Sequence, residues 1–344
     1  MRRTVAFDSL DSLEPLDAVD SRQKFRSTPN VASPGAERRP GHSADANWVV
    51  LDQANRVQAR CSLWWKSVPL HEDERLGLIG NYAAAEHEAA SVLLRRACAE
   101  LSKRGCTMAV GPMDGSTWGN YRLITERGNE PIFFLEPENP KDWPAQFSAA
   151  GFFPLARYYS SLVSDLSERD NPCRGSAERL REMGVEIRPI RASEVESDLR
   201  KIYHVVCRSF RKSFLYTPIS ESDFIAQYRL LLPHVRPELV LLAEREGVLI
   251  GFVFAVPDLF QLARAKVIDT VIVKTLSVLP ECAGAGLGGL LVEHVQQLAR
   301  SLGYRRAIHA LMHENNASRR ISAAAKSTTI RRYTLFARRL DERH

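Results

Sequence analysis

The sequence predicts an α/β fold in which a mixed sheet is covered by helices, and it predicts two tandem copies of that fold. Three observations support this prediction. Strand-like and helix-like segments alternate through the second half of the chain, a loop–helix–strand unit occurs twice, and a glycine-rich loop precedes the second of these helices. The 344 residues suffice for two domains of ordinary size.

The second half shows the clearest periodicity. A short strand is followed by two amphipathic helices, the second with Ser220 at its expected N-cap, and Gly247 marks the turn of a hairpin. The elements follow one another as β-α-α-β-β-β-α-β-α-β, an order typical of a mixed sheet covered by helices. Their expected ranges are 186–190, 193–213, 220–232, the hairpin 238–258, 267–279, the loop–helix–strand unit 284–316 and the last strand 331–340.

The repeated unit occupies residues 77–112 and 284–316. Each copy is expected to open with a glycine-bearing loop, GLIGNYA in the first, and to continue as a helix with an apolar stripe. Gly105 and Gly303 end the two helices, and a short strand follows each. We interpret the repeat as a duplicated domain. The predicted division is a disordered tail at 1–46, a first domain at 48–165, a linker at 166–184 and a second domain at 185–344.

Composition excludes several classes of protein. The net charge of +6 suits an anionic ligand, but the basic residues are spread along the chain without a nucleic-acid motif, so nucleic acid is not an expected partner. The six cysteines show no CxxC and no regular spacing, which argues against a disulfide framework and against a metal site. No apolar run reaches the roughly 18 residues of a membrane span, and no apolar segment follows Arg2 and Arg3. We therefore expect a cytoplasmic protein without a membrane partner.

The loop LPECAGAGLGGLL at 279–291 has two competing interpretations as a phosphate-binding site. Gly284, Gly286 and Gly289 fit the dinucleotide pattern G-x-G-x-x-G, for which Glu314 could supply the acidic residue. Four residues separate the strand from the first glycine, however, and only about 55 residues follow, too few for a doubly wound sheet. Glycines before a helix expose backbone N–H groups that favour phosphate oxygens. A purely structural turn is the remaining alternative.

The same loop resembles the GCN5-related N-acetyltransferase (GNAT) family. That family's signature is V-x-P-x-x-(R/Q)-G-x-G-x-(G/A) between its fourth strand and its central helix, and residues 278–288 match it except at Ala283, where Arg or Gln is usual. The resemblance covers about 185–340, and more weakly 48–165. It implies the acyl-CoA N-acyltransferase fold and acetyl-CoA, or another acyl-CoA, as co-substrate. The implied cofactor-binding residues are Leu276, Val278, Ala283, Gly284, Ala285, Gly286, Leu287, Gly288, Gly289 and Asn315.

The resemblance also implies direct transfer of the acyl group to an amine, without a covalent enzyme intermediate. A carboxylate is then expected to take the proton of the amine, with Asp269 as first candidate and Glu244 as second. Backbone N–H groups near Leu276 and Val278, where the strand splays, would polarise the thioester carbonyl. Relatives often protonate the departing thiolate with a Tyr at the position of Ser322, so Tyr333 becomes the candidate acid, with a packing role as the alternative.

The first domain supplies the expected acceptor site. Residues 111–123, GPMDGSTWGNYRL, gather Asp114, Trp118, Tyr121 and Arg122 in a turn-rich loop, which is either an acceptor-binding site or a structural loop with buried aromatic anchors. FSAAGFFPLARYYSSL at 147–162 resembles the closing region of the family, in which an aromatic-Gly-Phe turn joins the last two strands. We therefore expect a degenerate copy here, with the acceptor bound at the junction of the domains.

These observations predict an acyl-CoA-dependent N-acetyltransferase acting on a small-molecule amine. Two alternatives remain. A non-catalytic sensor or scaffold that binds acyl-CoA is suggested by Ala283 and Ser322, which replace residues usual in the family. An aminoacyl-tRNA-dependent transferase is compatible with the basic pI of about 9.0.

Overall fold

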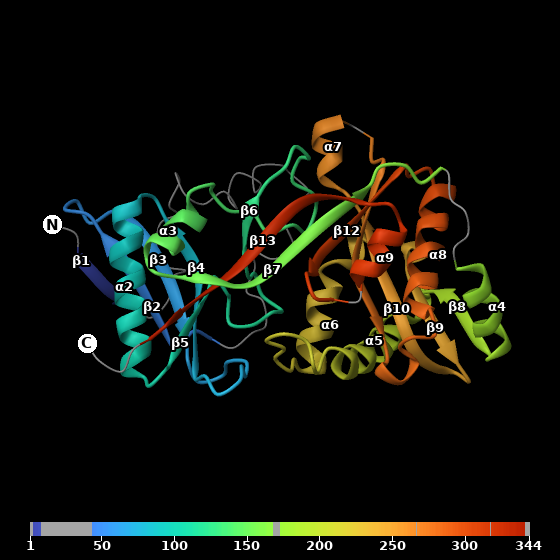
Figure 1. Cartoon of the computed structure of the whole chain (residues 1–344), viewed down its shortest axis with the longest axis horizontal. Helices are drawn as coiled ribbons and strands as arrows, with labels where there is room; N and C mark the ends of the chain where they lie inside the picture. Colours follow the sequence, from blue (N-terminus) through green and yellow to red (C-terminus); the bar gives the residue numbers. More distant parts are fainter. Residues whose placement is uncertain (1–2, 8–42, 168–172, 266, 317, 341–344) are drawn as a thin grey trace.

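The computed structural model describes residues 3–7, 43–167, 173–265, 267–316 and 318–340. In these residues thirteen strands form one sheet, with eight α-helices packed around it (Figure 1). The strands are β1 Arg3–Phe7, β2 Ala46–Leu51, β3 Val57–Trp64, β4 Leu76–Ala84, β5 Met108–Gly111, β6 Leu123–Glu126, β7 Phe153–Val163, β8 Val185–Pro189, β9 Val240–Arg245, β10 Val248–Pro257, β11 Thr270–Val278, β12 Arg306–His313 and β13 Thr328–Arg339. The helices are α2 His87–Lys103, α3 Trp143–Ala149, α4 Arg174–Glu182, α5 Val195–Ser209, α6 Glu221–Arg229, α7 Phe260–Ala265, α8 Leu287–Ser301 and α9 Ser318–Ala324.

The predicted repeat is present as two β-α-β units. β4 and β5 are parallel neighbours joined through α2, and β11 and β12 are parallel neighbours joined through α8. Gly105 and Gly303 follow the two helices with φ of 77° and 94°, the left-handed conformation that glycine adopts without a steric penalty. The mixed α/β fold class predicted from the sequence is confirmed.

Two long strands cross between the halves of the molecule. The sheet runs β1-β2-β3-β4-β5-β13-β7-β12-β11-β10-β9-β8, and Figure 1 shows β7 and β13 lying between the two units. β7 comes from the first half but pairs with β12, and β13 comes from the end of the chain but pairs with β5. These pairings join both halves into one hydrogen-bonded sheet. The predicted boundary between two domains at 166–184 stays a prediction, because β13, from the end of the chain, pairs with β5 of the first half.

Several local predictions are confirmed. The Ser220 hydroxyl accepts a hydrogen bond from the N–H of Asp223 at 3.1 Å and caps α6. The hairpin of β9 and β10 turns at Glu246 and Gly247, with φ of 52° and 75°, as a two-residue hairpin turn requires. The strand expected at the start of the second half is β8, and the last strand is β13.

The segment GLIGNYA is a strand, not the loop that the sequence predicts. It forms most of β4 and is almost wholly buried. Its glycines permit close packing: a Cβ on Gly77 would lie 2.6 Å from Cδ2 of Leu101, and a Cβ on Gly80 would lie 2.2 Å from the carbonyl oxygen of Met113. A glycine in a sequence can therefore indicate a close approach inside a strand, and not only a turn.

Two further predictions are corrected near the ends of the first half. The Gly turn in residues 147–162 does not join two strands, because Gly151, with φ of 83°, connects α3 to β7. The expected tail at 1–46 includes β1, which pairs antiparallel with β2 from Arg3↔Leu51 to Phe7↔Asn47. Residues 8–42 of that predicted tail lie outside the described residues.

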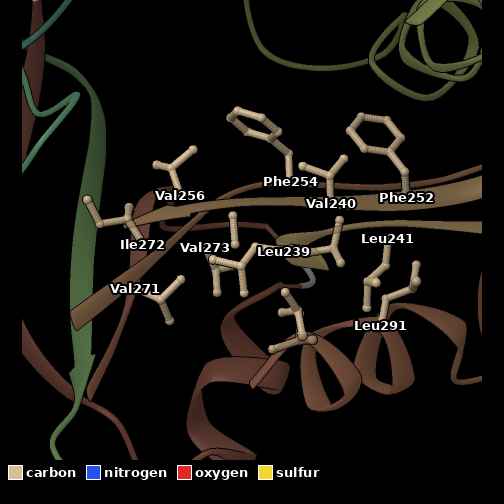
Figure 2. Packing of buried hydrophobic residues seen from close by; sticks show 14 of the residues in the cluster. Leu239, Val240, Leu241, Phe252, Phe254, Val256, Val271, Ile272, Val273 and Leu291 are labelled. Carbon is tan, nitrogen blue, oxygen red and sulfur yellow. The ribbon is translucent and has the colours of Figure 1, made fainter. Parts of the chain in front are cut away.

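The core of the second half fixes the position of α8. Figure 2 shows Phe252 and Phe254 pointing from β10 to one face of the sheet, while Leu291 approaches the opposite face from α8. All three side chains are buried, and α5 covers the face that the two phenylalanines occupy. This packing holds the N-terminus of α8 beside the end of β11.

The close approach at Gly80 gives a stability prediction. Gly80→Ala should lower the free energy of unfolding by roughly 1–3 kcal/mol, because the added methyl group meets backbone atoms that can yield only by shifting a strand. Gly175→Ala in α4 is the matched control, since nothing lies within 4 Å of the position that its added methyl group would take, and should change stability by less than about 1 kcal/mol. Urea unfolding measures both, and equal stabilities of the two variants would contradict the role assigned to Gly80.

Candidate functional site

The central strands β11 and β12 part halfway along their length. Their parallel pairing runs from Thr270↔Arg306 to Val273↔His309 and stops there, although β11 continues to Val278 and β12 to His313. Beyond the parting, β12 is irregular against β7, and Leu311 has a φ of 60°. The separated strand ends leave room for a ligand between them, in the middle of the sheet.

The glycine loop follows the end of β11, which still pairs with β10 but no longer with β12, after the short turn Pro280–Cys282. Gly284 and Gly286 have φ of 88° and 86°, and Gly286 is the N-cap of α8. Leu290 donates to the Gly286 carbonyl at 3.1 Å, but within the described residues the six N–H groups of residues 284–289 have no acceptor. Six free donors at the N-terminus of a 15-residue helix fit an anionic phosphate group. The fit supports the interpretation of this loop as a phosphate site.

A cavity of about 2100 Å³ joins this loop to the first half of the molecule. Its walls include residues of both halves, because the loop between β5 and β6 faces the parted ends of β11 and β12. Most residues singled out in the sequence line it together. They are Leu276, Val278, Ala283, Gly284, Gly286, Leu287, Gly288, Gly289 and Asn315 from the expected cofactor site, and Trp118, Tyr121 and Arg122 from the expected acceptor site.

Ala285 and Asp114 do not line the cavity. The Asp114 carboxylate accepts hydrogen bonds from the backbone N–H of Asn81 at 2.6 Å and from the side chain of Asn120 at 3.2 Å, which ties the loop to β4. Trp118 lines the cavity, while its indole N–H donates to the carbonyl of Thr217 at 2.8 Å. The acceptor loop therefore combines anchoring contacts with a wall of the cavity.

The two candidate bases lie away from the cavity. Asp269 precedes β11 at the end opposite the glycine loop, four residues and so about 13 Å before the parting at Val273. Burial disfavours its charge, but hydrogen bonds from Thr270 and Gln261 outweigh burial and lower the pKa of Asp269. Glu244 on β9 is held by Arg188 and Lys201, each at 2.9 Å. A catalytic role for Asp269 stays a prediction, and neither carboxylate reaches the parted strands directly.

Tyr333 lies under the cavity, not in its wall. Its side chain is fully buried, and burial followed by the neighbouring Glu136 carboxylate raises the pKa of the phenol. The hydroxyl donates to Glu136 and accepts from Ser160, whose oxygen lies 3.0 Å away. The Ser160 hydroxyl oxygen also accepts the N–H of Leu311 at 3.0 Å. Tyr333 thus supports the irregular segment of β12, and its role as a general acid stays a prediction.

Sequence reasoning missed several polar groups of this region. Glu136 lines the cavity and is held by Arg331 at 2.8 Å, a pair with almost no exposed surface. His309 joins Ser322 at 2.6 Å and Gln296 at 2.7 Å in a second buried network. No spacing pattern in the sequence links these residues: Glu136 and Arg331 are 195 positions apart, while His309 lies 13 positions from both Gln296 and Ser322, on the successive elements α8, β12 and α9. The sequence offers one signal for Glu136, because this carboxylate stands inside the otherwise apolar stretch FFLEP.

Comparison with known proteins identifies the second half. Residues 199–321 match the model of the acetyltransferase (GNAT) family. This segment is a GNAT domain. It contains the glycine loop, α8 and both parted strands, so the family assignment and the geometry concern the same site. No curated protein sequence gives a significant match to the chain.

Solved structures of GNAT proteins share the fold of the whole chain. A tandem GNAT protein from the clavulanic acid biosynthesis pathway matches with a TM-score of 0.52 at 12% identity, over 100% of both chains. A GCN5-related N-acetyltransferase from Sphaerobacter thermophilus gives 0.50 at 12% identity, over 86% of this chain and 80% of that one. A glucosamine N-acetyltransferase region of a fungal multi-domain β-N-acetylglucosaminidase gives 0.57 at 12% identity, over 98% and 38%. At these identities the likeness concerns the fold alone.

Three further features concern the described part of the chain as a whole. None of the helices in the described part of the chain has both the length and the apolar character that a membrane span requires. Nor do the described residues bring three His, Cys, Asp or Glu side chains together in a way that could hold a metal ion. All six cysteines are free thiols, and burial raises the pKa of Cys98 to about 11.

The free N–H groups of the loop give a binding prediction. Gly286→Trp should weaken acetyl-CoA binding at least about tenfold, because a side chain there both opposes the φ of 86° and fills the mouth of the loop beside Ser176. Ser301→Trp, at the exposed opposite end of α8, is the matched control. Calorimetric titration of both variants and of the unchanged protein measures the effect, and unaltered affinity of the Gly286→Trp variant would refute the assignment of this loop.

Proposed function

We propose that the protein is an acyl-CoA-dependent N-acyltransferase that acylates an amine of a small molecule, with acetyl-CoA as its simplest donor. The observation behind this proposal is the cavity in which the free N–H groups of residues 284–289 and the parted ends of β11 and β12 occur together. The GNAT domain at 199–321 supports the same activity, since members of that family are acyltransferases.

The residues of the loop fit the pyrophosphate of CoA. The N–H groups of residues 284–289 would bind its oxygens, and Ala283 leaves this task to the backbone because it offers no charged side chain. The edge of β11 near Leu276 and Val278 would hold the arm of the cofactor and direct N–H groups at the thioester carbonyl. When bound, acyl-CoA supplies an acyl group already activated as a thioester.

The amine must lose a proton to form the amide. Among the described residues, three carboxylates line the cavity, and protein donors already bind each one: Glu136 binds Arg331, Asp165 binds the N–H of Ser167 at 2.7 Å, and Glu293 binds the N–H of Cys173 at 3.2 Å. We therefore propose that water in the open cavity takes the proton. A thiolate leaves without an acid, because thiols ionise near pH 8.5.

This assignment predicts the pH dependence of the reaction. Below the pKa of the acceptor amine, kcat/KM should rise about tenfold per pH unit. The pH at which kcat/KM reaches its plateau should move from about 8 for an α-amino group to about 10 for a lysine-type amine. Initial rates with two acceptors of different amine pKa measure this. A plateau that starts between pH 6 and 7 with both acceptors would instead require a base on the protein.

Release of CoA thiol separates the proposed activity from its alternatives. Purified protein with acetyl-CoA and a panel of amines should release thiol in proportion to an N-acetylated product seen by mass spectrometry. Tight binding of acetyl-CoA without consumption would favour a sensor or scaffold. Absence of CoA binding together with salt-sensitive RNA binding would favour an aminoacyl-tRNA-dependent transferase.

We further propose a cytoplasmic location. Six free thiols, of which Cys61, Cys98 and Cys106 are buried, suit a reducing compartment.

A further inference from the structure

Arg122 is a buried cation in the wall of the cavity. It precedes β6, its side chain lines the cavity, and only 7% of its surface is exposed. Its backbone is fixed by a hydrogen bond from its N–H to the Pro112 carbonyl at 3.0 Å. A guanidinium at this depth requires compensation for the water it has lost.

Aromatic rings provide part of that compensation. The guanidinium carbon lies 4.1 Å from the ring centre of Tyr121, 4.2 Å from that of Tyr158 and 5.8 Å from that of Tyr333. These cation–π contacts orient the plane of the group. Tyr158 and Tyr333 bring no negative charge, because burial, first among the causes, raises the pKa of both phenols and keeps them neutral at ordinary pH.

The hydrogen-bonding capacity of Arg122 is left incomplete. Nη1 donates to the carbonyl of Leu311 at 3.4 Å. Nε is buried, and neither Nε nor Nη2 has a hydrogen-bond partner within the described residues, nor does any described carboxylate form an ion pair with this arginine. Nε has no contact with solvent, whereas Nη2 is not fully buried, so Nη2 is the donor of this guanidinium that a ligand can reach. A positively charged N–H donor of this kind suits a carboxylate oxygen.

Arg331 provides the internal comparison. It is equally buried, with 4% of its surface exposed, but it pairs with Glu136 at 2.8 Å and donates to the carbonyls of Glu130 and Pro131, each at 3.0 Å. Arg331 thus has a carboxylate and carbonyl partners, whereas Arg122 has no carboxylate partner among the described residues. Only Arg122 faces the cavity, so its missing partner is a ligand.

The surroundings of Arg122 also favour an anion. Leu311 belongs to the irregular segment of β12, beside the parted strands, so the guanidinium lies close to the place where the acyl group would be transferred. His313 packs edge-on against Tyr158, and its Nδ1 accepts the N–H of Asn315 at 3.1 Å, so the neutral ring carries its proton on Nε2. Burial lowers the pKa of His313 and favours that neutral form. Lys274 of β11 adds a further cation to the cavity wall.

From this arrangement, and resting on the proposed function, we infer that the acceptor is an amino acid or a similar amine with a free carboxylate, which Arg122 binds through Nη2. The amine nitrogen attacks the thioester carbonyl carbon, the C–N bond forms and the C–S bond breaks. The amine proton passes to water, and the products are an N-acyl amino acid and CoA thiolate. Arg122 holds the carboxylate and takes no part in proton transfer.

Matched acceptors test this inference. Acetyl-CoA is offered with amino acids, with their carboxamides and with the corresponding decarboxylated amines, and thiol release gives kcat/KM. The unchanged protein should prefer each acid over its carboxamide at least about tenfold, as expected for a charge-assisted pair. In Arg122→Met the ratio should fall to about 1, mainly through KM, and in Arg122→Lys it should be intermediate, because lysine keeps the charge but does not reproduce the position of the Nη2 donor.

Controls separate the possible failures. Arg56→Met removes an exposed arginine of the β2–β3 turn, which pairs with Asp52 and does not line the cavity, and should leave the ratio unchanged. Acetyl-CoA titration of every variant reports whether the donor site is intact. If the unchanged protein neither binds nor consumes acetyl-CoA, the proposed function fails; if it consumes acetyl-CoA but acetylates carboxamides as fast as acids, only the present inference fails.

Two further measurements make the result decisive. If Arg122→Met does not fold, calorimetric binding of the N-acetyl amino acid product to the unchanged protein and to Arg122→Lys replaces it, with an expected loss of at least about tenfold for the lysine variant. Phosphoethanolamine is included among the acceptors. A preference for it over the matched amino acids would overturn the assignment of a carboxylate and indicate a phosphorylated amine.

Discussion

The pairing of β7 and β13 across the middle of the molecule is the constraint on which the site depends. β7 comes from the first half of the chain but pairs with β12 of the second half, and β13 comes from the end of the chain but pairs with β5 of the first half. The two strands also pair with each other, so the two β-α-β units form one hydrogen-bonded sheet. The cavity lies where the units meet and takes its walls from both. Separating the halves would break the ladders of β7 and β13, and the fixed relation between the glycine loop and the loop around Arg122 would be lost.

Two buried arginines show how the same sheet performs a structural and a functional task. Arg331 and Tyr333 project from β13 and share the carboxylate of Glu136, which satisfies their polar groups beneath the cavity. Ser160 extends this network to the irregular segment of β12. Arg122 lines the cavity, and its Nη2 has no hydrogen-bond partner within the described residues. A buried network with all of its members bonded gives a rigid floor, on which an incompletely bonded cation can act as a binding group.

The proposed donor site is built from backbone groups. Positive φ at Gly284 and Gly286 turns the chain into α8, and the N–H groups of residues 284–289 have no acceptor among the residues that the structure describes. The parted strands extend this surface toward the centre of the sheet. Such a site tolerates Ala283 in place of a charged residue, since oriented N–H groups and the helix terminus supply the favourable potential.

The sequence by itself determined the elements of the second half, the repeated helix–strand unit and the glycine loop, because periodicity, capping and turn chemistry are local properties that neighbouring residues report. It also placed Trp118, Tyr121 and Arg122 among candidate acceptor contacts from their composition alone. The tertiary structure decided the rest. GLIGNYA is a strand whose glycines allow distant parts of the chain to approach closely. Asp269 lies outside the cavity because the pairing of β11 with β12 continues to Val273 before the strands part. The pairing of β13 with β5 and the buried pair of Arg331 and Glu136 join residues 195 or more positions apart, and no local pattern in the sequence reports them.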